Sequence, residues 1–417
     1  MKLKLFYNKK EFCLFSLFII LIFALNLAFK YHKFCEFKAN SRIFLQSQIL
    51  NSYDKTNAKG RTYTVLKLKS GNFTIYTTTK TGREFPRFAR VSVGIITQNL
   101  SFLDFVKARF YAPNFKISAP FYENSPKTKA INFIRSQHAN PLIADLYSAL
   151  YFATPMPYDL RQNITHWGIA HIVSISGFHL GIIFSSFFLI FAPIYRILQR
   201  RFFPWRNLKF DLSVTAILLM IGYLFVLDFT PSFLRSLAMC VVGFFLLWRN
   251  FELLNFANLF LSIALLLAVF PHLAFSVGFY FSSLGVLYIF LYSHHFWGKF
   301  GTLANLALFN LYVWFAMNIA VYFFFPLASF QQLSVIIIGY IFVIFYPLSV
   351  VLHLCGLGGV FDEALISFLN FTLPSFKAQI PLPLFVLTNL CALGAIRSKT
   401  CALICPILGI LPIFFIT

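Results

Sequence analysis

A short stretch near the middle of the chain combines residue types that could do chemistry inside a membrane. Residues 168–181 read Gly-Ile-Ala-His-Ile-Val-Ser-Ile-Ser-Gly-Phe-His-Leu-Gly and lead into a long apolar run. They include the histidines His171 and His179 and the serines Ser174 and Ser176. Polar groups at membrane depth are costly, so they usually face the interior of a helix bundle or a water-filled cavity. The stretch therefore predicts either a hydrated path or a seam between packed helices.

The same stretch gives weaker support for a metal site or a serine nucleophile. Gly177 and Gly181 are four residues apart, a spacing that permits close helix approach or a break in a helix. His171 and His179 could share a metal only across such a break, because eight residues of unbroken helix separate them by about 12 Å. Ser176 lacks the G-x-S-x-G elbow of a serine nucleophile and a nearby acidic residue. We expect no metal, no cofactor and no enzymatic activity, with an intramembrane serine hydrolase kept as an alternative.

The composition indicates what must position these residues. Of the 417 residues, 59% are hydrophobic and 12% are charged, with a mean hydropathy of +0.74. Soluble domains have about 45–50% apolar and about 25% charged residues. Apolar runs of about 18 residues or more with few charges predict membrane spans. These numbers exclude a soluble enzyme, a disordered chain and a fibrous protein, and they predict a multi-pass membrane protein.

About ten spans are expected, and basic residues orient them. Lysines before the first run and arginines after the second place both of those ends in the cytoplasm by the positive-inside rule. By the same count Arg397 and Lys399 fall on the wrong side, which leaves the last two spans uncertain. An interfacial or re-entrant helix is plausible within residues 357–378. The predicted apolar runs are 12–29, 169–195, 210–228, 232–249, 255–270, 273–293, 302–326, 333–355, 381–397 and 401–416.

The first run is predicted to be an uncleaved anchor over residues 1–30. No small-residue cleavage site follows it, since Lys30-Tyr31-His32-Lys33 comes next. The polar part that follows then lies outside the cytoplasm. Residues 30–165 contain 20 basic and 7 acidic residues, a balance that suits a polyanion such as nucleic acid or anionic lipid, or else a merely solubilising surface.

Residues 31–125 are predicted to form a small β-rich domain of the OB type. The runs 62–69 and 73–79 are rich in β-branched and aromatic residues, and Ser70-Gly71-Asn72 between them predicts a hairpin. Residues 91–96 and 105–111 are expected to be further strands, and several short strands of this kind favour a barrel. Residues 126–165 are expected to be a helical linker, and residues 166–417 the polytopic domain.

Basic and aromatic residues interleave along the predicted β-rich domain. Single-stranded nucleic acid is bound in this way, because bases stack on aromatic rings and phosphates meet basic side chains. Alternation also means that about half of the aromatic residues should face the core. The candidate DNA-binding residues are Lys67, Lys69, Arg83, Arg87, Arg90 and Tyr76.

Three blocks of the sequence resemble the ComEC family of DNA-uptake channels. Residues 171–180 are similar to the family's H-L-L-A-I-S-G-L-H-V, with Ser174 in place of the usual alanine. Residues 230–239 resemble its P-S-x-x-R-A-x-x-M element, with Ser236 for alanine, and residues 278–285 resemble G-F-Q-L-S-F-x-A, with Tyr280 for glutamine. The order of the blocks is that of the family, and the resemblance covers about residues 140–350.

The resemblance implies a channel in the cytoplasmic (inner) membrane that imports single-stranded DNA during natural transformation. It also implies an extracytoplasmic OB-like domain. The H-x-H-x-D-H motif of the metallo-β-lactamase-like domain that many members carry does not occur in the sequence, so a short form is expected. Degradation of the second strand then needs a separate nuclease. Without a Walker motif, any ATP-driven motor must be a separate cytoplasmic protein, and an extracytoplasmic DNA receptor, membrane lipid and an oligomer are further expected partners.

The expected fold class is therefore mainly α: a polytopic transmembrane helical bundle with a small extracytoplasmic β-rich, OB-like domain. Arg235 is interpreted as a phosphate contact at the pore mouth, as a partner of Asp228, or as an interfacial side chain. A small-molecule or lipid-linked transporter with broken helices stays open as an alternative function. The predicted channel-lining residues are His171, Ser176, Gly177, His179, Gly181, Pro231, Arg235 and Ser282.

Overall fold

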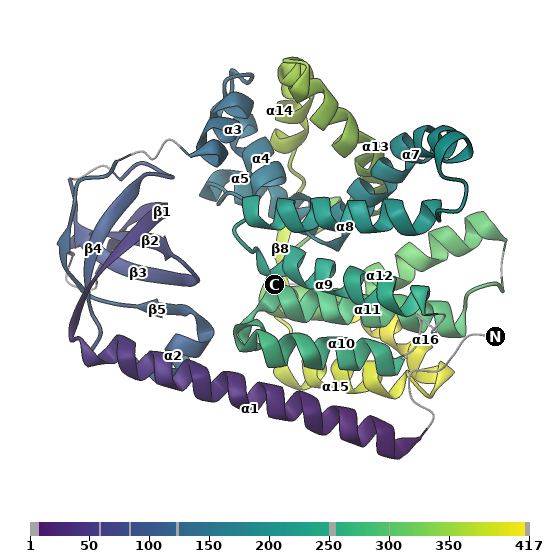
Figure 1. The fold of residues 1–417 in the computed structure, drawn as a ribbon. Coiled ribbons are helices and arrows are strands. Elements are labelled where there is room, and N and C mark those ends of the chain that lie inside the picture. The colour runs from purple at the N-terminus through teal and green to yellow at the C-terminus, as the bar shows by residue number, and fades with distance from the viewer. Residues whose placement is uncertain are drawn as a thin grey trace. The chain divides into compact units, whose positions relative to one another are not determined.

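Helices dominate the structure, and one small sheet lies in its N-terminal part (Figure 1). The structure is a computed structural model that describes residues 8–57, 60–82, 85–121, 125–249, 256–299 and 301–412. The chain divides into two compact units. One contains residues 8–132 and 264–276, and the other contains residues 133–263 together with the chain from residue 277 onward. Each unit has its own cluster of buried hydrophobic side chains.

The first unit consists mainly of a long helix and a six-stranded sheet. Helix α1 (Lys9–Ala39) has 31 residues and is long and apolar enough to cross a membrane. The strands lie in the order β5-β3-β2-β1-β4-β6, and β3 and β5 form the parallel pair in this sheet. Their bounds are β1 (Arg42–Thr56), β2 (Thr62–Ser70), β3 (Phe73–Lys80), β4 (Arg90–Ile96), β5 (Arg109–Tyr111) and β6 (Asn114–Ile117).

The predicted hairpin is confirmed, whereas the predicted strand over 105–111 is half wrong. Strands β2 and β3 pair up to Ser70 and Phe73, and Gly71 in the turn has φ +53°, a value that glycine adopts without strain. Residues 102–107 instead form helix α2 (Phe102–Lys107). The Ser101 hydroxyl caps it by accepting from the Asp104 amide at 3.1 Å. The serine cap overrode the β propensity of this segment.

The sheet buries one face and curls so that its two ends meet. The side chains of Leu66, Leu68 and Ile75 are fully buried on its inner face. Asn114 on β6, at one edge, donates to the Thr77 hydroxyl and to the Thr78 carbonyl on β3, at 2.7 and 2.6 Å. Since β3 lies near the opposite edge of the sheet, these bonds join its two ends.

Each of the ten predicted runs contains an apolar helix among the described residues, although in the run 401–416 the helix ends at Leu408 and residues 413–416 lie outside the described part. Seven of the described helices are long and apolar enough to cross a membrane, while α10, α15 and α16 are shorter. The helices after the sheet are α3 (Pro126–Arg135), α4 (Pro141–Phe152), α5 (Tyr158–His166), α6 (Ala170–Val173), α7 (Gly177–Phe202), α8 (Leu208–Val226), α9 (Pro231–Trp248), α10 (Phe256–Val269), α11 (Val277–His295), α12 (Thr302–Phe324), α13 (Val335–Leu354), α14 (Asp362–Asn370), α15 (Leu382–Gly394) and α16 (Lys399–Leu408).

A two-stranded β-ribbon brings the segment between α12 and α15, which contains α13, back to the end of the bundle at which that segment begins. Strand β7 (Leu327–Ser329) follows α12 and pairs antiparallel with β8 (Ser375–Lys377), which precedes α15. The end of α12 and the start of α15 therefore lie at the same end of the bundle. Although α13 is long enough to span, the intervening segment makes no net crossing. Helix α14 falls within the predicted 357–378 segment, and its interfacial position stays a prediction.

Because the segment that contains α13 makes no net crossing, Arg397 and Lys399 are assigned to the other side of the membrane from the one predicted by the sequence count. The His295 Nε2 atom at the end of α11 lies 2.7 Å from the Ala395 carbonyl oxygen, so the turn before Lys399 shares an end of the bundle with Lys299. The sequence count placed these two basic residues on the opposite side because it treated α13 as one crossing. Without that crossing, Lys299, Arg397 and Lys399 all agree with the positive-inside rule.

Candidate functional site

The predicted His/Ser/Gly stretch is a broken helix. The one-turn helix α6 ends at Val173, the C-cap residue Ser174 has an extended ψ of 127°, and α7 begins at Gly177 after the N-cap residue Ser176. The Ser176 hydroxyl accepts from the Phe178 amide at 3.3 Å, and the Ser176 amide donates to His179 Nδ1 at 3.3 Å. The two contacts form a capping box, which satisfies backbone groups at the start of α7. Part of the polar character of the stretch therefore serves this helix start.

The side chains of the stretch do not share one surface. His171 is exposed, and its Nδ1 lies 3.1 Å from the Gly168 carbonyl oxygen; Gly181 is exposed as well. His179 is 0% exposed and packs edge-on against Phe342 and Tyr346, with ring centroids 5.3 and 5.0 Å away. Because His179 Nδ1 accepts a hydrogen bond, the neutral ring carries its proton on Nε2, and that atom is buried with no partner among the residues that the structure describes.

The contacts of Ser176 and His179 differ from those of a nucleophile and its base. The His179 ring reaches the backbone amide of Ser176 and not its hydroxyl, which is engaged as the cap. A base must lie within hydrogen-bond reach of the hydroxyl proton that it removes. The geometry therefore gives no support to the hydrolase alternative.

The structure brings the three resembling blocks together. A Cβ atom on Gly177 would lie 2.8 Å from Ser236 Oγ, so any larger residue would displace the Ser236 hydroxyl where α7 approaches α9. The Ser232 hydroxyl donates to the Ile175 carbonyl. Arg235 Nη1 donates to the Gly278 carbonyl at 3.4 Å and so connects α9 to α11. Residues from 171–181, 230–239 and 278–285 thus meet at one place.

Three helix N-termini converge there. Helix α7 begins at Gly177, α9 at Pro231 and α11 at Val277, and each has at least 18 residues. The amide groups of a first turn lack partners within the helix, and the helix dipole places partial positive charge at this end. Together they make the meeting point of the blocks favourable for an anion.

Arg235 is the largest fully buried side chain among the described residues, at 1% exposure. Its guanidinium donates to the Ser232 carbonyl, the Ser236 hydroxyl and the Gly278 carbonyl, each at 3.4 Å, and lies 5.8 Å from the Phe279 ring centroid. All three acceptors are neutral and distant for a charged donor. The interpretations as an interfacial side chain and as a partner of Asp228 are wrong, because the guanidinium is buried and bonds elsewhere.

The remaining channel-lining candidates lie on the same helices. Pro231 is exposed in the first turn of α9, and Ser282 is half-buried on α11. The channel-lining roles stay predictions. Tyr280 keeps a polar contact where the family has glutamine, since its hydroxyl donates to Asn389 Oδ1 at 2.7 Å.

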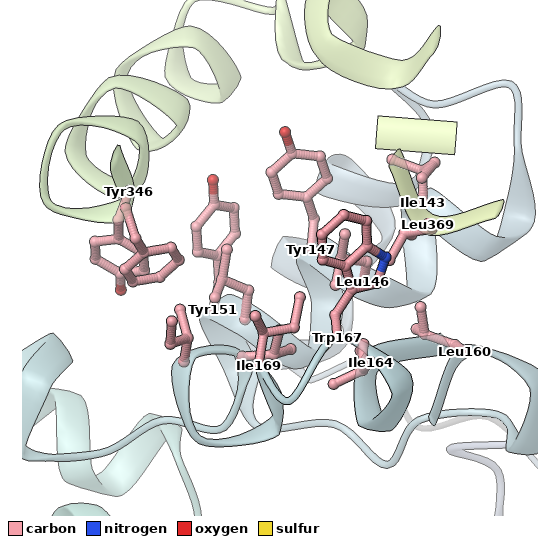
Figure 2. Packing of buried hydrophobic residues seen from close by; sticks show 14 of the residues in the cluster. Ile143, Leu146, Tyr147, Tyr151, Leu160, Ile164, Trp167, Ile169, Tyr346 and Leu369 are labelled. Atoms are coloured by element: carbon pink, nitrogen blue, oxygen red, sulfur yellow. The ribbon is translucent and has the colours of Figure 1, made fainter. Parts of the chain in front are cut away.

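Sequence reasoning missed a buried polar cluster formed by residues far apart in the chain. His138, between α3 and α4, lies 2.8 Å from Asp362 Oδ1 through Nδ1 and 3.0 Å from His353 Nε2 through its own Nε2. Tyr147 and Tyr151 of α4 lie beside the cluster, with ring centroids 4.8 Å from that of His138 and 5.3 Å from that of His353, respectively. Figure 2 shows the hydroxyl groups of the two tyrosines pointing to the same side. The signal available in the sequence was the presence of Ser349 and His353 in an otherwise apolar helix. Among the described residues, no group of three or more His, Cys, Asp or Glu side chains has an arrangement that could hold a metal.

In the β-rich unit, several candidate DNA-binding residues lie in register. Lys67 on β2 is opposite Tyr76 on β3, and Tyr76 is opposite Tyr111 on β5. Arg109, which was not among the candidates, donates to the Tyr76 hydroxyl at 2.7 Å, and its guanidinium lies 5.1 Å from the Tyr76 ring centroid. Together with Lys69, these four residues form what we call the basic–aromatic face.

The other three candidates lie elsewhere. Arg87 donates to Asn51 Oδ1 at 3.0 Å, and Arg90 is exposed at the start of β4. Arg83 lies outside the described residues.

Comparison with known proteins gives one match. No curated protein and no solved structure matches the chain. Residues 153–417, more than half of the chain, match the family model described as Competence protein. The matched part contains the broken helix, Arg235 and the segment that includes α13. The chain therefore belongs to the Competence protein family.

Proposed function

We propose that the chain forms a channel in the cytoplasmic membrane through which single-stranded DNA enters during natural transformation. Family membership and the multi-pass helical structure support a membrane role in DNA uptake. The observation that carries the proposal is the convergence of three helix N-termini on the buried Arg235. DNA phosphates cannot be stripped of water without replacement contacts. A site of partial and full positive charge supplies such contacts at the entrance to the bundle.

The arrangement suits a passing phosphate rather than a permanent anion. Arg235 keeps hydrogen-bond capacity because its acceptors are neutral and each is 3.4 Å away. A phosphate oxygen would bind guanidinium more strongly, in shorter and charge-assisted bonds. Exposed His171 and Gly181 lie near this place along the sequence, and they and Ser176 would line the path.

The β-rich unit is proposed to be an OB-type barrel that receives the strand before the channel. Its parallel β3–β5 pair, its β1–β4 pair and the bonds of Asn114 that join the two ends of the sheet support a closed barrel. The basic–aromatic face would stack bases on Tyr76 and Tyr111 and pair phosphates with Lys67, Lys69 and Arg109.

Replacing Lys67 and Lys69 together with alanine is expected to flatten the salt dependence of DNA binding. Each lost phosphate contact lowers the slope of log K against log salt by about 0.7 for a single strand, so the double variant loses about 1.4. The slope is measured by fluorescence anisotropy with a labelled single strand and the full chain in detergent. Phe34 of α1 packs into the core of the sheet, so a fragment without α1 would lack part of that core.

The matched control removes two lysines from outside this face. Lys116 is on β6 at the other edge of the sheet, and Lys129 is on α3. Lys116→Ala with Lys129→Ala removes the same charge and should leave the slope close to that of the wild type. Equal flattening by both pairs would show that total charge, and not this face, binds the strand.

The channel is proposed to act with separate proteins. An extracytoplasmic receptor would deliver DNA, a nuclease would remove the second strand, and a cytoplasmic ATP-driven motor would pull the strand inward. In this scheme the chain itself carries out no chemical step and needs no cofactor.

Deletion of the gene is expected to stop DNA at the cytoplasmic membrane. Labelled DNA should still become protected from external nuclease but should no longer reach the cytoplasm, because entry through the outer layers does not need this channel. The two compartments are separated by fractionation and their labelled DNA is counted. Expression of the full chain from a plasmid is the control. Normal cytoplasmic DNA in the deletion strain would contradict the proposal.

A further inference from the structure

The buried polar cluster connects two parts of the bundle that lie more than 200 residues apart in sequence. His138 lies between α3 and α4, whereas His353 is at the end of α13 and Asp362 at the start of α14. The His138 side chain is 0% exposed and that of Asp362 is 14% exposed. His353 Nδ1 lies 2.7 Å from the Ser349 carbonyl oxygen. Three contacts therefore run in line: Asp362 to His138, His138 to His353, and His353 to the Ser349 carbonyl.

The number of hydrogen atoms that these three contacts require determines the net charge of the group formed by Asp362, His138 and His353. Each of the three contacts needs one hydrogen between its two heavy atoms. A carboxylate with two neutral histidines carries only two hydrogens on the participating atoms. Tyr151 cannot supply the third, because its hydroxyl donates to Ser349 Oγ at 2.7 Å. The three contacts are all satisfied only when one further proton is bound, on either histidine or on Asp362.

Together with these three contacts, hydrogen bonds of Gln137 hold the segment from α3 to α4 against the turn between α13 and α14. Gln137 donates to the His353 carbonyl at 3.1 Å and accepts from the Gly358 amide at 2.9 Å. A Cβ on Gly358 would lie 2.6 Å from the His353 ring, so the turn approaches too closely for any other residue. Loss of the proton leaves two lone pairs facing each other in one contact, most simply between the two Nε2 atoms 3.0 Å apart. The attraction across this junction is then replaced by repulsion.

We propose that Asp362, His138 and His353 form a binding site for a single proton, and that loss of this proton releases residues 133–152 from α13 and α14. We call this junction the proton latch. Only two nitrogen atoms converge in it, fewer than the three protein ligands of a zinc site.

A series of side-chain contacts connects the latch to the broken helix. Ser349 Oγ donates to the Tyr346 carbonyl at 2.8 Å, and the Tyr346 ring packs against His179 with centroids 5.0 Å apart. His179 belongs to the capping box that begins α7. Opening of the latch would therefore loosen the packing of the proposed channel entrance, a consequence that rests on the function proposed above. The latch itself does not depend on DNA.

The other titratable groups near the latch are neutral, paired or exposed to solvent. Tyr147 of α4 stacks on His138 at 4.8 Å, and Tyr151 of the same helix lies 3.3 Å from His353 Nδ1. Burial raises the pKa of both tyrosines, and the Asp362 carboxylate raises that of Tyr147 further. On the neighbouring segment Arg135 is paired with Asp145, and Glu363 of α14 is exposed. The charge change on loss of the proton therefore falls on the two histidines and Asp362.

Amide hydrogen exchange of the full chain in nanodiscs tests the proposal without DNA. In the wild type, protection of residues 133–152, corrected for the intrinsic effect of pH, should fall about tenfold between about pH 5.5 and pH 8.5. Asp362→Asn should abolish this fall. The asparagine amide can donate to His138 Nδ1, so two neutral histidines and the amide supply all three hydrogens at any pH.

Glu363→Gln is the matched control, since it removes the neighbouring exposed carboxylate and should keep the wild-type response. The wild-type measurement needs no variant, so the test survives if Asp362→Asn does not fold. Protection that is independent of pH in the wild type, or an equal fall in Asp362→Asn, would overturn the proton latch. A channel that fails to import DNA leaves this result unaffected.

Discussion

Replacement of Arg235 with methionine is expected to reduce DNA entry into the cytoplasm by at least about tenfold, since one charge-assisted hydrogen bond contributes about 1.5–3 kcal/mol. The same change should leave the protein as stable as the wild type or more stable. Arg235 is 1% exposed and bonds to neutral acceptors at 3.4 Å. Burying a charge without a counter-charge is costly, and an apolar residue of similar length removes that cost. If Arg235 destabilises the folded protein but is required for DNA entry, its contact with the passing DNA strand explains why the chain contains an arginine at this position.

The measurement pairs cytoplasmic DNA counts with thermal unfolding of the purified variant. Arg249→Met is the matched control, because Arg249 is exposed and follows the opposite end of α9. It should change neither quantity. Arg235→Lys keeps the charge but loses the planar fork of donors, so intermediate entry is expected. A large loss of thermal stability in Arg235→Met, with DNA entry falling in proportion, would assign Arg235 to helix packing instead.

Local patterns in the sequence predicted the elements that depend on neighbouring residues. The β2–β3 hairpin follows from alternation and a glycine turn, and each apolar run contains a helix in the part that the structure describes. The three resembling blocks were found separately along the chain, and their meeting was not predicted. It depends on Gly177, Ser232 and Arg235 making contacts across more than 40 residues of sequence.

Long-range pairing accounts for what the sequence did not predict. The hydropathy of α13 records its length and composition, whereas its return to the same end of the bundle depends on β7 and β8, each of three residues. Strands this short carry no usable alternation. His138, His353 and Asp362 have no common motif, because their contacts exist only once α4, α13 and α14 have packed.

Of the two histidines of the broken helix, His171 is expected to act in DNA entry and His179 is expected to stabilise the fold. His171→Ala removes an exposed ring whose Nδ1 contacts the Gly168 carbonyl, so stability should stay close to the wild type. If His171 lines the path, DNA entry should still fall severalfold. His179→Ala removes a ring that is 0% exposed and ends its contact with the Ser176 amide. The cavity and the lost cap together should cost about 2–4 kcal/mol.

His179→Gln distinguishes a structural role from a direct one. Glutamine is one of the two usual residues at position N3 of a capping box, the position of His179, and its side-chain oxygen can accept from the Ser176 amide as His179 Nδ1 does. Thermal unfolding and DNA entry should therefore both recover toward the wild type in His179→Gln relative to His179→Ala. Recovery of stability without recovery of DNA entry would show that the imidazole itself is needed, and His179 would then join His171 as a residue of the path. Loss of stability in His171→Ala equal to that in His179→Ala would mean instead that the whole stretch is a packing seam, and that the strand crosses elsewhere in the bundle.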